Sequence, residues 1–381
     1  MTEKTSSRLA TIDFLRGIAA LGVVIHHAFG SPVIALPALP AGDVILDSVR
    51  NLIPAFGFSG VYLFFVISGF CIHLRWVKAQ TVGDGKALEF IPFWKRRIVR
   101  LYPAYLVALL LYIGFEVYTG KLHFGPFFFY DLFSHLFMLH NLDTRTVYSF
   151  NKVFWTLAVE EQLYLAYFLL IWLRTKYGWL VTIGVTVLMR VAWFGLAFVL
   201  IKAFGLPIPI TESAVATWCI WALGAVSIEA KYGLIKLPKI LSMFSAGAAV
   251  LVITAICCVI GWSTPPSGAI ARTTVFLVQP LFGLGFFIIV NYTVGLESKL
   301  RNWYGRVIKL FAWVGLFSYS LYLTHELIVT YTGVGPYAMV LLSLPFAWVF
   351  YLLFEKPFMT QTPKRDQTAV PAVDTGSHER G

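Results

Sequence analysis

The sequence predicts an all-α protein, a polytopic membrane helix bundle of about ten transmembrane helices plus one short re-entrant or interfacial helix. Hydrophobic residues make up 58% of the chain and charged residues only 13%, whereas about a quarter of a typical soluble domain is charged. The mean hydropathy is +0.75. Ten segments approach the ~20 apolar residues that a helix needs to cross a bilayer, namely residues 11–29, 56–76, 102–119, 154–173, 178–201, 213–229, 240–262, 272–292, 310–330 and 336–354.

The first three segments each carry a distinguishing feature. Residues 11–29 contain Asp13 and Arg16 and lack a small-residue cleavage pattern, so we expect a retained helix rather than a signal peptide. Residues 56–76 contain several glycines, which permit close helix packing. Pro103 is expected to break the chain at the start of the third segment.

The middle of the chain contains a hairpin and a short apolar piece. Only "RTKY" (174–177) separates the fourth and fifth segments, which predicts a tight helical hairpin. Residues 126–141 are apolar but short, and Asp131 and His135 interrupt them. This piece is interpreted as re-entrant or interfacial, and the five later segments are expected to span the membrane.

The charges predict the orientation. If the N-terminus is cytoplasmic, most of the 30 Lys and Arg residues fall in inner loops, as the positive-inside rule requires. Both termini are then cytoplasmic, with one transmembrane domain over residues 1–360 and a disordered polar tail over 361–381. The excess of basic over acidic residues therefore reflects the membrane topology and not nucleic-acid binding. The four cysteines lie in apolar segments without metal-ligand spacing, so no metal site is expected.

Arg16 and His27 are the first candidate functional residues. They are eleven positions apart, which places them about 20° from three whole helical turns and about 16 Å apart along the axis. Asp13 can pair with Arg16, while His26 is turned away. Ionisable residues inside a membrane usually line a cavity or path, and histidine is suited to proton transfer near neutral pH. In the alternative, Asp13 and Arg16 only snorkel to the inner interface.

A basic cluster lies in the stretch "FWKRRIVRLYP" (93–103). Arg96, Arg97 and Arg100 are spaced to gather on one side of a short helix. Such a cluster binds anionic lipid as ordinary positive-inside chemistry. It can equally bind a polyphosphate ligand, because arginine grips phosphate bidentately. Spacing alone does not favour either interpretation.

The fourth segment carries Glu160, Glu161 and Gln162 inside an otherwise apolar helix. The two carboxylates point about 100° apart, so only one needs to face a cavity. Packing alone does not account for this polar group, which favours a functional role or an arginine partner. Arg190 in the fifth segment is a candidate partner, with a structural role favoured over a catalytic one.

The ninth segment carries a polar stripe. Tyr319, Tyr322 and His325 follow one another at three-residue steps, and Glu326 lies next to the histidine. A functional histidine and a satisfied packing histidine have equal weight here.

Taken together, these motifs resemble those of the acyltransferase-3 family of integral-membrane enzymes. Arg16 and His27 match the family's arginine–histidine spacing, and "GFSGVYLFFVISGF" resembles its second-segment signature. "FWKRRIVRLYP" resembles its arginine motif and indicates Arg97 and Arg100. "FWTLAVEEQLYL" resembles the pattern that contains Trp155, Glu160, Gln162 and Tyr164. "SYSLYLTH" and "FEKPF" (354–358) resemble the C-terminal signatures.

The resemblance implies a membrane-bound O-acyltransferase. It would move an acyl group, acetyl by default, from acetyl-CoA or another acyl-CoA to a hydroxyl of a cell-surface or lipid-linked saccharide, in the inner (cytoplasmic) membrane. Its partners would be the saccharide or glycolipid acceptor, membrane lipid and proteins of polysaccharide assembly. The implied catalytic residues are His27, Arg16 and Glu160; those for the cofactor are Arg16, Arg96, Arg97 and Arg100; and those for the substrate are Trp155, Gln162, Tyr164, Tyr319 and His325.

His27 would take the acceptor hydroxyl's proton or carry the acyl group transiently. Arg16 and His27 would then mark the two ends of one path for a phosphate-anchored CoA. The competing class is a secondary transporter or flippase that uses the same His, Glu and Arg side chains as a proton relay. The missing internal repeat and the arginine cluster count against it.

Overall fold

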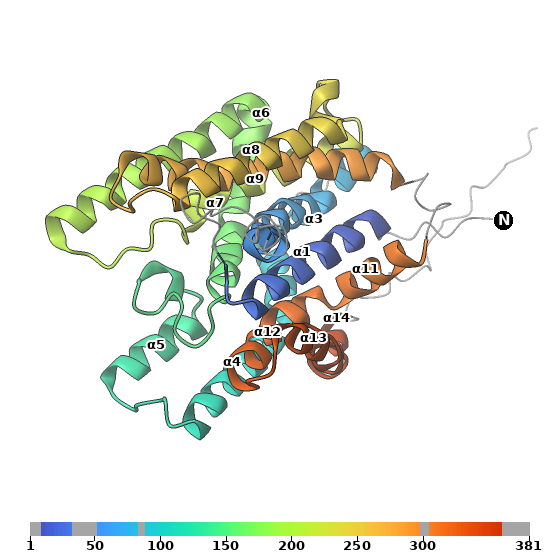
Figure 1. Cartoon of the computed structure of the whole chain (residues 1–381). Helices are drawn as coiled ribbons and strands as arrows, with labels where there is room; N and C mark the ends of the chain where they lie inside the picture. Colours follow the sequence, from blue (N-terminus) through green and yellow to red (C-terminus); the bar gives the residue numbers. More distant parts are fainter. Residues whose placement is uncertain (1–8, 33–51, 83–87, 298–304, 360–381) are drawn as a thin grey trace, which may run out of the picture.

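The computed structural model describes residues 9–32, 52–82, 88–297 and 305–359, and these residues form an all-helical bundle (Figure 1). The predicted tail over 361–381 lies outside the described residues. In Figure 1, α6, α8 and α9 lie on one side of the central pair α1 and α3, and α4, α12 and α13 lie on the other. The principal helices are α1 (Ala10–Ala28), α3 (Gly60–Val82), α4 (Phe90–Tyr118), α5 (Pro126–Leu136), α6 (Trp155–Phe204), α7 (Ala214–Lys231), α8 (Phe244–Trp262), α9 (Ala269–Gly295), α11 (Arg306–Leu316), α12 (Ser318–Tyr331), α13 (Pro336–Phe350) and α14 (Lys356–Met359).

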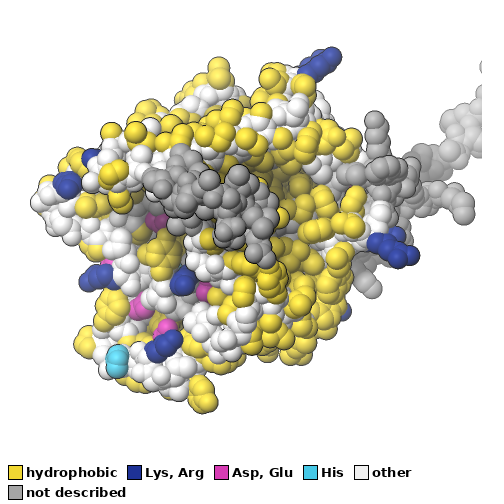
Figure 2. Space-filling view, in the orientation of Figure 1, with side chains coloured by type: hydrophobic (Ala, Val, Ile, Leu, Met, Phe, Trp, Pro, Cys, Tyr) yellow, Lys and Arg dark blue, Asp and Glu magenta, His cyan; other side chains and the backbone are white. Residues whose placement is uncertain are grey.

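Within the described residues, eight helices are long and apolar enough to cross a membrane, or up to nine if α11 and α12 form one span. Large apolar side chains such as Leu180, Leu188 and Leu341 are exposed, and hydrophobic side chains dominate the surface in Figure 2. Apolar surface of this extent indicates contact with lipid. The chain is therefore a multi-pass membrane protein, although the count of ten spans is not reproduced.

The difference in count arises partly at α6. This element has 50 residues, and a straight helix of that length would measure about 75 Å, more than twice the ~30 Å hydrocarbon core. Gly178 interrupts it with φ 77° and ψ 175°, a region that only glycine occupies readily. The kink lies directly after the predicted "RTKY" turn.

Hydrogen bonds among side chains of α3, α6 and α7 stabilise this kink. Glu229 on α7 accepts hydrogen bonds from Arg174 Nε at 2.7 Å and Trp179 Nε1 at 2.8 Å, one residue on each side of the break. His73 on α3 donates to the same carboxylate at 3.0 Å. His73 and Glu229 are fully buried. No local sequence pattern marks this cluster, because it joins residues far apart in the chain.

We expect Gly178→Ala to destabilise the protein by about 1–3 kcal/mol, because alanine is strained at this backbone conformation. Gly184 is the matched control, since it lies in helical backbone and a Cβ there meets nothing within 4 Å. Gly184→Ala should leave the stability unchanged or raise it slightly. Thermal unfolding in detergent measures both variants, and equal melting temperatures would contradict the assignment of Gly178 as a required glycine.

Two expectations for the first half of the chain differ from the structure. Pro103 lies inside α4 and does not break it, so the arginine stretch forms the first turns of a membrane helix. Arg190 does not pair with Glu160 or Glu161. It donates instead to Gln279 Oε1 at 3.0 Å and Phe276 O at 2.7 Å, which ties the second half of α6 to α9.

The short piece at 126–141 forms α5, which is not among the candidate spans. This agrees with a re-entrant or interfacial helix. The loop after it is ordered by Asp143, which accepts hydrogen bonds from the Arg145 side chain. These bonds lower the pKa of the Asp143 carboxyl below its ordinary value.

The predicted span 310–330 is broken. Helices α11 and α12 meet at an angle of 80° beside Phe317. A carboxylate supplied by a distant part of the chain supports the new helix start: Glu355 Oε2 accepts from Ser320 N at 3.2 Å and from Ser320 Oγ at 2.5 Å. Because these bonds satisfy a first-turn amide, α12 begins inside the bundle.

Candidate active site

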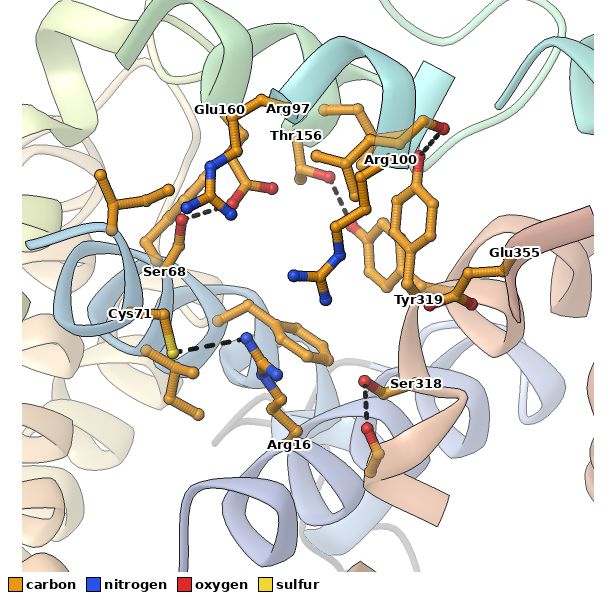
Figure 3. A pocket seen from close by; sticks show the side chains of 18 of the residues that line it. Arg16, Ser68, Cys71, Arg97, Arg100, Thr156, Glu160, Ser318, Tyr319 and Glu355 are labelled. Atoms are coloured by element: carbon orange, nitrogen blue, oxygen red, sulfur yellow. Dashed lines mark hydrogen bonds between the residues drawn. The ribbon is translucent and has the colours of Figure 1, made fainter. Parts of the chain in front are cut away.

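A cavity of about 140 Å³ with charged and apolar walls lies where α1, α3, α4, α6, α11 and α12 meet (Figure 3). Phe64, Phe65 and Ile67 of α3 form an apolar part of its wall. The charged side chains that line it are Arg16, Arg97, Arg100, Glu160 and Glu355.

Three arginines converge on this cavity. Figure 3 shows the guanidinium groups of Arg16 and Arg100 turned into it and Arg97 beside Glu160. Arg16 lies 3.5 Å from Cys71 Sγ and 3.9 Å from Asp13 Oδ1. The Nε atoms of Arg97 and Arg100 are buried without a hydrogen-bond partner. A buried donor without an acceptor is costly, so the site is suited to a ligand that brings acceptor oxygens.

Arg96 does not share this arrangement. It is exposed and is absent from the cavity lining. The helix turns 100° between neighbouring residues, so Arg97 and Arg100 enter the cavity while Arg96 faces outward. The expectation that all three arginines share one side of the helix therefore holds only for Arg97 and Arg100.

Glu160 is the carboxylate of its pair that lines the cavity. Ser68 Oγ of α3 donates a hydrogen bond to it, and Tyr164 Oη donates at 2.5 Å. Two hydroxyls thus fix the carboxylate beside Arg97. The hydroxyl of Ser68 therefore has a side-chain partner inside the bundle.

Two proposed substrate residues lie away from the cavity lining. Gln162 donates to Met138 O at 3.1 Å and to Asn141 Oδ1 at 2.6 Å, which holds the loop after α5. Trp155 packs its ring against Phe65, with 6.4 Å between centroids. Neither residue lines the cavity.

Tyrosines of α12 and α6 line the cavity instead. Tyr164 and Tyr319 are both part of the wall, and Tyr319 Oη donates to Leu101 O at 3.0 Å. Tyr322 also lines the cavity, and its hydroxyl lies 2.9 Å from Thr156 Oγ1. The contact between Tyr322 and Thr156 closes part of the cavity wall.

His27 does not line the cavity. Its Nδ1 lies 3.0 Å from His325 Nε2 and 3.3 Å from Glu326 Oε1. His325 contacts Tyr322, with 6.0 Å between ring centroids. The cavity therefore reaches Arg16 and the wall residue Tyr322, whereas the imidazole of His27 lies outside the lining and contacts His325 and Glu326.

Three further residues belong to this region that the sequence did not assign to the site, although Tyr322 and Glu326 lie in its polar stripe. Glu355 and Tyr322 line the cavity, and Glu326 faces His27. The resemblance of "FEKPF" to a terminal motif was the one signal for Glu355, and the three-residue stripe was the signal for Tyr322.

One group in the described residues has the geometry of a metal site. The ligand atoms of His27, His325 and Glu326 all lie within 4.8 Å of one another. Two imidazoles and a carboxylate would suit Zn²⁺, but the two imidazoles also hydrogen-bond each other.

Comparisons with known proteins match most of the chain to one family model and less than half of it to individual relatives. The family model described as an acyltransferase domain matches residues 9–354. The peptidoglycan O-acetyltransferase OatA of Listeria monocytogenes serovar 1/2a is 28% identical over 194 residues, which cover 45% of this chain and 26% of the relative. The O-acetyltransferase OatA of Staphylococcus aureus strain NCTC 8325 / PS 47 is 29% identical over 176 residues, 43% of this chain and 24% of the relative.

The chain thus matches only about a quarter of the length of these relatives. No solved structure matches. The family match covers Arg16, Arg97, Arg100 and Glu160 of the cavity, and it also covers His27 and His325. This chain belongs to the acyltransferase-3 family.

Proposed function

We propose that this protein is an O-acyltransferase that moves an acyl group, with acetyl as the first candidate, from acyl-CoA to a saccharide hydroxyl. The observation that carries the proposal is the convergence of Arg16, Arg97 and Arg100 on one cavity, with two buried N–H groups that have no acceptor. CoA carries several phosphates, and arginine binds phosphate bidentately.

Two helices lead from the arginines to His27. Along α1, Arg16 and His27 are separated by about 16 Å, a length comparable to the extended pantetheine arm of CoA. Along α12, Tyr319 and Tyr322 of the cavity precede His325 by one or two turns. A phosphate-anchored CoA would place its thioester against the Tyr322 wall, and movement of that side chain would admit it to His27.

The chemistry is a thioester-to-ester exchange with His27 as general base. The acceptor hydroxyl gives its proton to the imidazole while its oxygen bonds to the acyl carbonyl carbon. The C–S bond then breaks, and the leaving thiolate of CoA takes the proton back from the imidazolium. No net proton or electron is consumed.

Other residues support binding. Tyr164 and Tyr319 line the cavity and would contact the arm or the acyl group, while Glu160 would help to place the donor. Arg96, exposed beside the cavity's arginines, would attract the anionic donor at longer range. Trp155 and Gln162 do not line the donor cavity, and they would instead contact the saccharide acceptor.

The name of one relative supports the proposed acceptor. One relative is named for peptidoglycan, which supports a cell-surface or lipid-linked saccharide as the acceptor. An inner-membrane location with both termini cytoplasmic would place the arginine stretch where CoA is available. Proteins of polysaccharide assembly would then hand over or receive the acceptor.

Thermal stability of the detergent-purified protein tests the proposal. Acetyl-CoA should raise the melting temperature, because a ligand stabilises the state that binds it. Pantetheine, which lacks phosphates, is the matched control and should give no shift at equal concentration. Membranes supplied with labelled acetyl-CoA should transfer the label to saccharide. Absence of both the shift and the transfer, together with proton-coupled uptake by vesicles, would identify a transporter instead.

A further inference from the structure

We propose that His325 and Glu326 are positioning residues that fix the tautomer and ring orientation of His27. This inference rests on the proposed function, in which His27 acts as the general base. His27 comes from α1 and the other two residues from α12, and the three approach one another outside the cavity lining. His325 is fully buried and Glu326 is 2% exposed.

The backbone of α12 determines which nitrogen of His325 carries hydrogen. His325 Nδ1 lies 3.0 Å from Tyr322 O and 3.1 Å from Leu321 O. A carbonyl oxygen only accepts, so Nδ1 must donate. In the neutral ring the other nitrogen, Nε2, then holds the lone pair. His325 therefore presents an acceptor to its neighbour.

That acceptor in turn determines the state of His27. His27 Nδ1 lies 3.0 Å from His325 Nε2, and therefore it must carry the hydrogen and donate. Since a neutral imidazole has one N–H, the lone pair of His27 is left on Nε2. The chain of contacts from a backbone carbonyl through two rings thus produces the tautomer that a general base requires.

The charge of Glu326 favours the same assignment. Its Oε1 lies 3.3 Å from His27 Nδ1 and is buried without a hydrogen-bond partner, while its Oε2 accepts from Thr330 Oγ1 at 3.3 Å. A negative oxygen at this distance favours the tautomer that carries hydrogen on Nδ1. When Nε2 takes the hydroxyl proton, this carboxylate stabilises the imidazolium, as the buried acid does in a Ser-His-Asp triad.

The remaining neighbours of His27 do not disturb this arrangement. His26 lies with its ring centroid 5.3 Å from that of His27, and its Nδ1 donates to Pro54 O at 2.7 Å. Lys152, from the loop before α6, is the cation that acts on His27 electrostatically. Glu326 is the carboxylate in contact with the ring, so its removal should change the proton affinity of His27 most.

Three variants test the assignment in steady-state transfer from acetyl-CoA. His325→Leu removes the acceptor and should lower kcat by about 10²-fold with KM for acetyl-CoA unchanged. His325→Gln restores an acceptor oxygen and should recover a large part of that loss. Glu326→Gln keeps the shape without the charge, so it should lower kcat and move the acidic limb of the pH–kcat profile to lower pH.

The matched control is His26→Gln, which replaces the neighbouring imidazole with another donor and should keep kcat within about twofold. The shift in melting temperature with acetyl-CoA verifies folding, because the arginine cavity is separate from these residues. If His325→Leu does not fold, the near-isosteric Glu326→Gln still tests the positioning role. Its two readouts are kcat and the position of the acidic limb of the pH–kcat profile.

Two results would overturn the assignment without affecting the proposed function. In one, Glu326→Gln and His325→Leu keep wild-type kcat while His27→Ala is inactive. In the other, a chelator abolishes wild-type transfer and Zn²⁺ restores it, which would make the three residues metal ligands. Activity in His27→Ala would instead remove the proposed function itself.

Discussion

His27→Ala is expected to abolish acyl transfer while leaving acetyl-CoA binding intact. The substitution removes the general base, and positioned acid–base catalysis contributes roughly 10²–10⁴-fold to a rate. His27 is outside the arginine cavity, so the phosphates keep their partners. We therefore expect a loss of kcat of at least 10²-fold and an unchanged stabilisation by acetyl-CoA, measured on the same purified sample.

The two readouts separate a chemical role from a structural one. Loss of both transfer and ligand stabilisation would indicate a misfolded protein. His26→Gln provides the comparison in which an adjacent imidazole is changed and transfer is kept. Transfer near the wild-type rate in His27→Ala would exclude both the general-base role and an acyl-histidine.

Substitution of the cavity's arginines should have the second large effect, on donor affinity. A hydrogen bond to a charged group contributes about 1.5–3 kcal/mol, which corresponds to about 10–10²-fold in Kd. Arg97→Gln and Arg100→Gln should each weaken acetyl-CoA binding by this factor. The double variant should lose more than either, because both guanidiniums enter the same cavity.

Arg96→Gln is the matched control on the same helix. It removes the same charge from an exposed position that does not line the cavity, so the affinity should change less than threefold at physiological salt. Isothermal titration with acetyl-CoA measures all four proteins. Equal losses in Arg96→Gln and Arg97→Gln would favour diffuse attraction by a basic surface, as anionic lipid binding would use, over a defined phosphate site.

The sequence predicted well what depends on local pattern. Apolar runs placed the helices, and the spacing of Arg97 and Arg100 placed both on the cavity side of α4. Neighbouring Glu160 and Glu161 were expected to face different ways, and only Glu160 lines the cavity. Each of these follows from helical periodicity within one segment.

The errors arose where one segment depends on another. Pro103 was expected to break α4, yet a membrane helix tolerates proline when its surroundings satisfy the backbone groups that proline leaves. The break between α11 and α12 depends on Glu355, a residue 35 positions after Ser320. Arg190 donates to Gln279 of α9, and not to Glu160 or Glu161 in the first half of α6.

The same limit applies to the candidate site. Periodicity placed Arg16 and His27 on one face of α1, but it gave no information on how α12 aligns beside α1. That alignment places His325 and Glu326 against His27, and it places Tyr322 in the cavity wall with its ring centroid 6.0 Å from that of His325. His325 thus meets the imidazole of His27, whereas the resemblance implied a substrate contact.

The most direct test of the account is a structure of the protein in lipid nanodiscs with CoA bound. The account predicts CoA phosphates within hydrogen-bond distance of Arg97 and Arg100. It also predicts that the thiol lies past a displaced Tyr322, next to His27. Phosphates held outside this cavity, or a thiol directed away from α12, would contradict it.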